Sequence, residues 1–197
     1  MSKKLDELLE KRDGNLSMKE ARLEGISPST VQAYVKSGRL LAIERGFYVL
    51  DGHGIDELFL QQNRFSRGIF SYETALDIHQ LSGNMPAAIH LTFPKGYNVS
   101  RKEMKAQNLK FHFVPKNIYE LGKIEGLSFQ DNPIYLYDKE RTLCDIWSSR
   151  FDMAYDLKLE SLKNYMSSKE RDPGKLSVYM NKLSVSKEMH THMLSLI

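Results

Sequence analysis

The sequence contains very few cysteines and no long apolar run. Its single cysteine, Cys144, excludes an internal disulfide and a cysteine-based metal cluster. No stretch approaches the roughly 18 consecutive apolar residues that a membrane-spanning helix requires. The first residues, Met1 to Asp6, also lack the apolar core of a signal peptide. We therefore expect a cytoplasmic protein with no membrane partner, in which Cys144 is a buried structural thiol.

The remaining composition is that of an ordinary folded protein. Hydrophobic residues make up 41% and charged residues 27% of the 197-residue chain. This length suits two domains, which we place at 1–52 and 53–197. The net charge of +3 is too small to indicate a nucleic-acid partner, so the distribution of charge matters more than its total.

Two short helices joined by a tight turn are predicted near the N-terminus. Ser17 and Glu20 have the spacing of a capping box, which starts a helix that ends at Gly25. Pro28 suits the first position of a second helix, which Gly38 closes. This is a helix-turn-helix arrangement, whose second helix enters the DNA major groove.

The outward face of this second helix predicts the residues that contact DNA. Val31, Tyr34 and Val35 form one apolar stripe, so the polar residues between them face outward. Glutamine can bond an adenine edge, alanine can contact a thymine methyl, and hydroxyl or basic side chains can reach phosphates. The alternative is an ordinary solvated helix face. The candidate residues are Ser27, Ser29, Thr30, Gln32, Ala33, Lys36 and Arg39.

Residues 40–50 predict a β-hairpin that follows the two helices. Two β-rich runs flank the dipeptide Arg45-Gly46, which is typical of a turn. A hairpin in this place is a wing, and a basic residue at its tip commonly reaches the DNA backbone or minor groove. The order of helix, turn, helix and hairpin predicts a winged helix-turn-helix that binds double-stranded DNA.

The chain resembles the AbiEi antitoxins of type IV toxin-antitoxin systems, which act in bacterial abortive infection and phage resistance. The resemblance rests on five segments taken together, because each alone is common. These are Gly25-Ile26-Ser27 with Gly38 and Leu40, Arg45-Gly46-Phe47-Tyr48, Phe70 to Leu76, Pro94 to Tyr97, and Tyr137 to Asp145.

The resemblance implies a transcriptional repressor that binds repeats in the promoter of its own operon. It also implies an antitoxin that counters a nucleotidyltransferase-like toxin without forming a stable complex with it. Since the sequence contains no heptad repeat, we expect a monomer in solution that loads onto paired repeats. An alternative is an enzyme that modifies the toxin covalently, for example by phosphoryl transfer, and another is a regulator with no toxin partner.

The rest of the chain predicts a mixed α/β domain that ends in helices, so the overall class is α+β. Helical periodicity predicts two helices before a sheet, the second capped by Ser71, and further helices after it. Alternating β-rich runs predict strands, two of them ended by prolines. We expect the sheet within about 86–137 and the later helices within about 139–197. The expected helices are 56–62, 71–80, 139–149, 155–166, 173–183 and 187–196, and the expected strands are 89–93, 110–114 and 135–137.

A basic segment at 95–123 contains seven basic and two acidic side chains. Positive charge on one face is sufficient for phosphate contacts, so this segment would supply much of the affinity for DNA. A solvated loop is an equally good interpretation. The candidates in this segment are Lys95, Arg101, Lys102, Lys105 and Lys110.

Arg141 and Asp145 have the i, i+4 spacing of a helical ion pair, which we expect on the surface. In the alternative interpretation Ser71, Glu73, Arg141 and Asp145 form a pocket that carries antitoxicity. No phosphate-binding glycine loop, nucleophile elbow or HExxH motif supports an enzyme. Four of the six histidines, at 90, 112, 190 and 192, lack ligand spacing, so we expect no metal and no cofactor.

Overall fold

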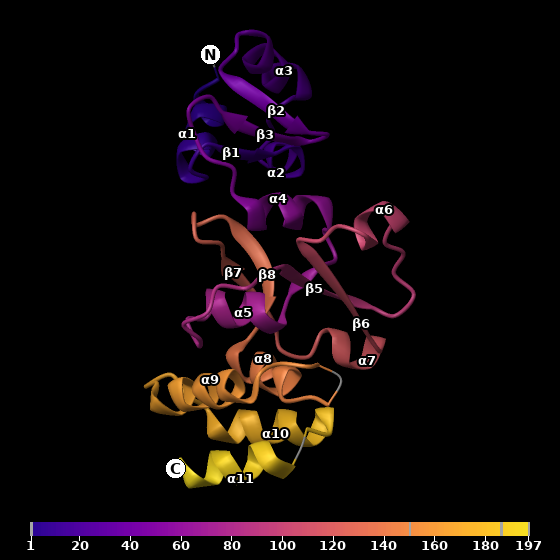
Figure 1. Ribbon diagram of the computed structural model, residues 1–197. Coiled ribbons are helices and arrows are strands. Elements are labelled where there is room, and N and C mark those ends of the chain that lie inside the picture. The colour runs from indigo at the N-terminus through magenta and orange to yellow at the C-terminus, as the bar shows by residue number, and fades with distance from the viewer. Residues whose placement is uncertain (1, 150, 186, 197) are drawn as a thin grey trace. The chain divides into compact units, whose positions relative to one another are not determined.

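A computed structural model describes residues 2–149, 151–185 and 187–196. Its contacts divide the chain into two compact units (Figure 1). The N-terminal unit contains Met1–Arg67 and Gly126–Ile134, and the C-terminal unit contains Gly68–Glu125 and Tyr135–Ile197. Both units combine helices with a sheet, which confirms the α+β class. The sequence predicted a division after residue 52, whereas this grouping extends the first unit to residue 67 and adds a loop from the second half.

The N-terminal unit is a three-stranded antiparallel sheet with helices on both faces. Its strand order is β1-β3-β2. Sequence reasoning found the two middle helices and the hairpin but missed the first helix and first strand. The elements are α1 (Lys3–Lys11), β1 (Asn15–Ser17), α2 (Met18–Leu23), α3 (Pro28–Lys36), β2 (Leu40–Glu44), β3 (Phe47–Leu50) and α4 (Glu57–Arg64).

Local capping explains where α2 and α3 begin and end. The left-handed φ angles of Gly25 (73°) and Gly38 (77°) close the two helices as predicted. The Ser27 side chain accepts a hydrogen bond from the Thr30 N–H, and Pro28 occupies the first turn of α3. Two short helices joined by a tight turn therefore lie where the sequence predicts them, which is consistent with a helix-turn-helix.

The capping box predicted at Ser17 and Glu20 is wrong, although the helix starts where expected. Ser17 precedes α2, but its hydroxyl donates to Asn63 Oδ1 at 2.8 Å instead of capping the helix. Glu20 pairs with Arg12. Partners far along the chain thus replace the local bonds that the spacing predicted. The described residues that do form a capping box are Ser100 and Glu103, at the start of α6.

Two apolar clusters cover the two faces of the N-terminal sheet. Leu16, Leu40 and Tyr48 pack with residues of α1, α2 and α3 on one side. On the other side, Phe47 and Val49 pack against α4. The wing strand β3 therefore contributes to both clusters, because its side chains alternate between the faces.

The C-terminal unit contains most of a five-stranded mixed sheet with the order β6-β5-β4-β8-β7. β5 runs parallel to β6 and antiparallel to β4, and β4 runs parallel to β8. The predicted strands and helices are present, and β4, β7, α6 and α7 were not predicted. The elements are β4 (Ile69–Phe70), α5 (Tyr72–Ile78), β5 (Ile89–Pro94), α6 (Arg101–Met104), β6 (Leu109–Val114), α7 (Lys116–Tyr119), β7 (Lys123–Leu127), β8 (Pro133–Tyr137), α8 (Lys139–Ile146), α9 (Tyr155–Ser167), α10 (Pro173–Leu183) and α11 (Lys187–Ser195).

The largest apolar cluster lies among the C-terminal helices. It joins α5 and α8 with α9, α10 and α11, through residues such as Leu143, Leu162 and Leu176. Cys144 is buried in this cluster, as predicted, and burial raises the pKa of its thiol. Trp147, the single tryptophan of the chain, is also buried there and can therefore report on the folding of this unit.

Candidate nucleic-acid interface

The outward face of α3 is accessible along its length. Ser29, Gln32, Ala33 and Lys36 are exposed, and Thr30 is half-buried. Val31 and Tyr34 are buried beneath them. The predicted outward orientation of these side chains is confirmed, and their contact with bases stays a prediction.

The hydroxyl of Ser27 lies at the start of α3. It lies 2.8 Å from Ser29 Oγ and 2.9 Å from Thr30 Oγ1, and it caps α3. These bonds hold the first turn of the helix in place. Ser27 therefore supports the exposed face of α3, and its own contact with DNA stays a prediction.

The turn of the wing places an exposed Arg45 next to α2. Gly46 has a φ of 84°, which the tight turn requires, and its carbonyl accepts a hydrogen bond from the Met18 N–H at 2.8 Å. This bond fixes the tip of the hairpin to the first residue of α2. The predicted position of Arg45 at the tip is confirmed.

A groove of about 690 Å³ lies between α2, α3 and the wing turn. Basic side chains from α2 and the wing line it together with Gln32 of α3, so a polyanion that enters the groove meets base-reading and phosphate-binding groups together. Its lining residues are Met18, Lys19, Arg22, Leu23, Pro28, Gln32, Arg45, Gly46, Tyr48 and Asn63.

Lys19 and Arg22 were missed as candidates by sequence reasoning. Both are exposed, and they lie three residues apart on α2, on either side of the buried Ala21. That spacing on the short first helix was the available signal, because residues three apart share a helix face. With Arg45 they give the groove three basic side chains.

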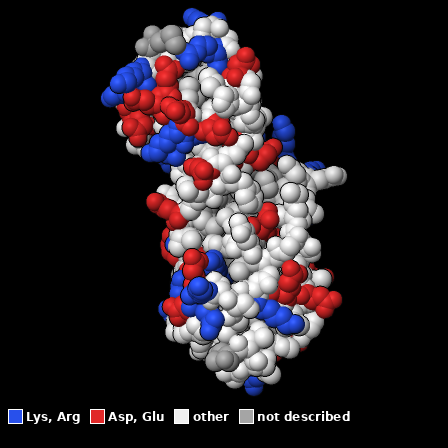
Figure 2. All heavy atoms as spheres, turned by 90° about the vertical axis from the view of Figure 1, so that its left-hand side faces the viewer, with Lys and Arg blue, Asp and Glu red and all other residues white. Residues whose placement is uncertain are grey.

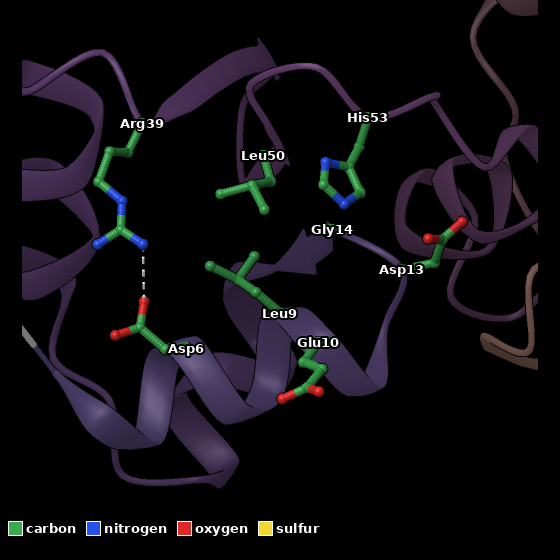
Figure 3. Close-up of a pocket in the computed structure, with 8 residues that line it drawn as sticks. All are labelled: Asp6, Leu9, Glu10, Asp13, Gly14, Arg39, Leu50 and His53. Carbon is green, nitrogen blue, oxygen red and sulfur yellow. Dashed lines mark hydrogen bonds and ion pairs between the residues drawn. The ribbon is translucent and has the colours of Figure 1, made fainter.

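Arg39 does not line this groove, although it was a candidate. It lies in a second concavity of about 390 Å³, where its guanidinium donates to Asp6 Oδ1 at 3.2 Å (Figure 3). Its carbon Cζ also lies 4.7 Å from the centre of the Tyr34 ring. Figure 3 shows Leu9 and Leu50 between this ion pair and His53.

This second concavity has an acidic rim that disfavours a phosphate backbone. Asp6, Glu10 and Asp13 line it, and all three come from α1 or the turn after it. On the face of the N-terminal unit drawn in Figure 2, acidic side chains gather beside basic ones, so that face is not uniformly positive. Negative charge repels DNA, so the groove beside α3 is the better candidate interface.

The basic residues predicted between 95 and 123 do not form one patch. Lys95, Arg101, Lys102 and Lys105 are exposed in the connection between β5 and β6. Lys110 is also exposed, but it is paired in register with His90 near the start of β5, whereas Lys95 follows the end of that strand. These strands are parallel, so Lys110 lies at the opposite end from Lys95. Their contact with DNA stays a prediction.

Two histidines, the buried His90 and the half-buried His112, lie beside Lys110. His90 Nδ1 and His112 Nε2 are 3.0 Å apart, and the Tyr72 ring lies 4.0 Å from the His112 ring, centre to centre. Burial, with the charge of Lys110 adding to it, lowers the pKa of His90 to about 4. Burial and then the two neighbours His90 and Lys110 lower the pKa of His112 to about 3. Both rings are therefore neutral at pH 7, as structural histidines are.

The ion pair between Arg141 and Asp145 is present, but the prediction that it lies on the surface is wrong. Arg141 Nε lies 3.0 Å from both oxygens of Asp145, and the Arg141 side chain is 0% exposed. Arg141 Nη1 also donates to the carbonyls of Ile118 (2.6 Å) and Leu121 (2.8 Å). The helical spacing predicted the pairing correctly, but the turns after α7 cover it.

The Asp145 carboxyl is buried, which disfavours its charged form. Burial raises its pKa to about 6, against the opposing effect of the Arg141 charge. The Arg141 guanidinium stacks over Tyr137, with its carbon Cζ 4.2 Å from the ring centre. Its Nη2 is buried with no hydrogen-bond partner among the described residues.

The four residues considered for antitoxicity do not share one set of interactions. Ser71 is fully buried and accepts a hydrogen bond from Thr92 Oγ1 at 2.8 Å, so it does not cap α5 as predicted. Glu73 is half-buried, and no bond among the described residues joins it to the other three. Arg141 and Asp145 bond to each other. These contacts indicate that the side chains stabilise the fold, and they give no support for a shared reactive site.

The described residues contain neither a cluster of metal ligands nor a membrane-spanning helix. No group of three or more His, Cys, Asp or Glu side chains among them could hold a metal ion. No described helix is both long enough and apolar enough to cross a membrane.

The N-terminal unit has the features of a DNA-binding module. Two helices joined by a tight turn are followed by a hairpin, and a basic groove lies beside the exposed helix, which is consistent with a winged helix-turn-helix. Residues 3–50 match the family model described as "Transcriptional regulator, AbiEi antitoxin". The resemblance to AbiEi antitoxins is thus confirmed for this segment, and it indicates a DNA-binding antitoxin.

One solved structure shares the fold of the whole chain. The RV2827C protein from Mycobacterium tuberculosis matches with a TM-score of 0.57 and 11% identity, over 98% of this chain and 74% of that one. At this identity the likeness concerns the fold alone. No curated protein matches the chain.

Proposed function

We propose that this protein is a type IV antitoxin that represses its own operon by binding promoter repeats through a winged helix-turn-helix. The observation that carries the proposal is the groove in which Lys19, Arg22 and Arg45 surround Gln32. The family match over residues 3–50 supports it independently. The protein is active in the cytoplasm, where its promoter DNA is found.

In this proposal α3 enters the major groove and the wing contacts the backbone. Gln32 reads an adenine edge and Ala33 contacts a thymine methyl, because both are exposed on the same helix. Lys19, Arg22 and Arg45 bind phosphates and set the register of the helix. The protein binds each repeat as a monomer.

The antitoxin role concerns a nucleotidyltransferase-like toxin that the protein counters without a stable complex. The family match supports an antitoxin, and the absence of a stable complex follows from the resemblance to type IV systems. The catalytic alternative gains no support from Arg141, whose Nε and Nη1 are bonded to Asp145 and to two backbone carbonyls and whose side chain is fully buried. We therefore propose a non-enzymatic protein.

DNA binding is tested by fluorescence anisotropy with a duplex that carries the region upstream of the gene. Arg45→Ala should raise the Kd several-fold and reduce the slope of log K against log salt by about 0.9, which is one phosphate contact. Gln32→Ala should cost about 1–3 kcal/mol of discrimination between the repeat and a scrambled duplex. Lys11→Ala, which removes an exposed cation of α1 outside the groove, is the matched control. A wild-type affinity that changes neither with the salt concentration nor with the sequence of the duplex would refute the proposal.

The antitoxin role is tested by co-expression with the product of the neighbouring toxin gene. Full-length protein should restore growth, and gel filtration of the two purified proteins should show no shared peak. The intact mass of the toxin, measured after incubation with this protein and nucleotide, should not change. A covalent mass increase would favour the enzyme that we considered as the alternative.

A further inference from the structure

The wing is supported by α4, a helix that lies outside the segment matched by the family. Phe59 and Leu60 of α4 pack with Phe47 and Val49 of the wing strand β3. The rings of Phe47 and Phe59 meet edge to face, with their centres 5.5 Å apart. All four side chains are buried, so this face of the wing is complete only when α4 is present.

The last turn of α4 is bonded both to the wing and to the residue that precedes α2. Arg64 donates to Glu44 Oε2 from Nε (3.1 Å) and Nη2 (2.5 Å), and Glu44 directly precedes Arg45. Asn63 lines the groove and accepts a hydrogen bond from Ser17, the residue before α2. Because Met18 N–H also bonds the wing carbonyl of Gly46, the turn that carries Arg45 is held from two sides.

The first turn of α4 is held by a loop from the second half of the sequence. The buried carboxylate of Asp56 caps α4 by accepting the Phe59 N–H at 3.0 Å. Its other oxygen accepts hydrogen bonds from Asn132 Nδ2, at 2.8 Å, and from the Ser128 hydroxyl. Ser128 and Asn132 lie between β7 and β8, in the segment that belongs to the N-terminal unit.

We propose that α4 and the β7–β8 loop complete the DNA-binding unit, and that Arg64 and Asn132 are positioning residues for the wing. Arg64 fixes the strand end that leads to Arg45, and Asn132 fixes the start of the helix that carries Arg64. Neither residue touches DNA. Since the loop joins two strands of the C-terminal sheet, DNA affinity depends on residues far from the reading helix. This inference rests on the proposed DNA-binding function.

The test is a double-mutant cycle in the full-length protein with the upstream duplex. Arg64→Met keeps the aliphatic stem and removes the bonds to Glu44. It should raise the Kd about fivefold and lower the salt slope by less than 0.9, because Arg45 is less well placed. In an Arg45→Ala background the same change should have almost no effect. Equal effects in both backgrounds would overturn the positioning role, because they would show that Arg64 acts on DNA independently of Arg45.

Two further variants separate positioning from direct contact and from misfolding. The double variant Glu44→Arg, Arg64→Glu keeps the total charge of the ion pair. It should recover most of the affinity that the single variant Arg64→Glu loses. Asn132→Ala changes no charge and removes a bond to Asp56 at the other end of α4. It should also raise the Kd, and this effect should be lost in an Arg45→Ala background. Lys11→Met is the matched control for loss of a cation. Thermal melting confirms that each variant is folded at the assay temperature.

The outcomes distinguish this inference from the function on which it rests. Wild-type protein that does not bind the duplex would overturn both. Wild-type protein that binds and loses affinity with Arg45→Ala, together with Arg64→Met and Asn132→Ala variants that bind normally, would overturn the inference alone.

Discussion

Replacing Arg141 with methionine should unfold much of the C-terminal unit at modest denaturant concentrations. The side chain is 0% exposed and holds three partners, which are the Asp145 carboxylate and the carbonyls of Ile118 and Leu121. Methionine replaces the aliphatic stem of arginine and lacks the guanidinium, so the change removes the bonds and keeps part of the packing.

The expected loss can be worked from these partners. Removing one member of a buried ion pair costs about 3–5 kcal/mol, because the other charge stays buried without compensation. Each carbonyl that loses its donor adds about 1–3 kcal/mol where no other donor replaces it. Asp145 can limit the cost by taking up a proton, since burial already raises its pKa to about 6. We therefore expect a loss of at least about 3 kcal/mol, against a typical total of about 5–15 kcal/mol.

The assay is urea unfolding followed by the fluorescence of Trp147, which is buried in the C-terminal core. Arg171→Met is the matched control, since Arg171 is exposed, and it should change stability by less than about 0.5 kcal/mol. The double variant with Asp145→Met should be no less stable than Arg141→Met, because no carboxylate is then left unpaired. A loss below about 1 kcal/mol for Arg141→Met would refute the structural role that we assign to the pair.

Two other predictions concern the histidine pair and the wing. Folded His90 and His112 have pKa values of about 4 and 3, below the ordinary 6.5, so the folded state binds fewer protons and loses stability as the pH falls from about 6.5. Asp145 acts in the opposite direction, and the net loss between pH 7 and pH 5 should be about 2 kcal/mol. Each histidine contributes a loss of about 1.8 kcal/mol over this range. His112→Phe should therefore remove most of the net loss in urea titrations at the two pH values, and an unchanged loss would contradict the assignment. A fragment of residues 1–52 exposes the face of Phe47 that α4 covers and should lack cooperative thermal unfolding, whereas a sharp two-state melt of this fragment would contradict the role of α4.

Local signals in the sequence predicted the elements of the fold well. Glycines 25 and 38 close helices because each has a positive φ, and Pro28 begins α3 because its missing N–H has no partner there. The strands β5 and β6 were predicted from alternation and prolines. The short strands β1 and β4, of three and two residues, were missed because so few residues give no periodicity.

The candidate site was predicted less completely than the fold. The exposure of Gln32 and the place of Arg45 follow from helix period and turn chemistry, which are local. Arg39, like Arg45, is a basic residue close to the predicted DNA-binding helix, but it bonds Asp6, 33 residues earlier in the chain. A basic residue alone does not indicate whether its partner is DNA or a carboxylate of the same protein.

The errors at the helix starts share one physical cause, which is competition from partners far along the chain. Ser17 bonds Asn63 at a separation of 46 residues, and Asp56 bonds Asn132 at a separation of 76. A serine or an aspartate before a helix predicts a local cap, because that partner is always near. When a distant partner competes, the same residue can serve tertiary structure instead, as Ser17 does, or both, as Asp56 does. A boundary drawn from local signals at residue 50 or 52 therefore separates the wing from the helix and the loop that hold it.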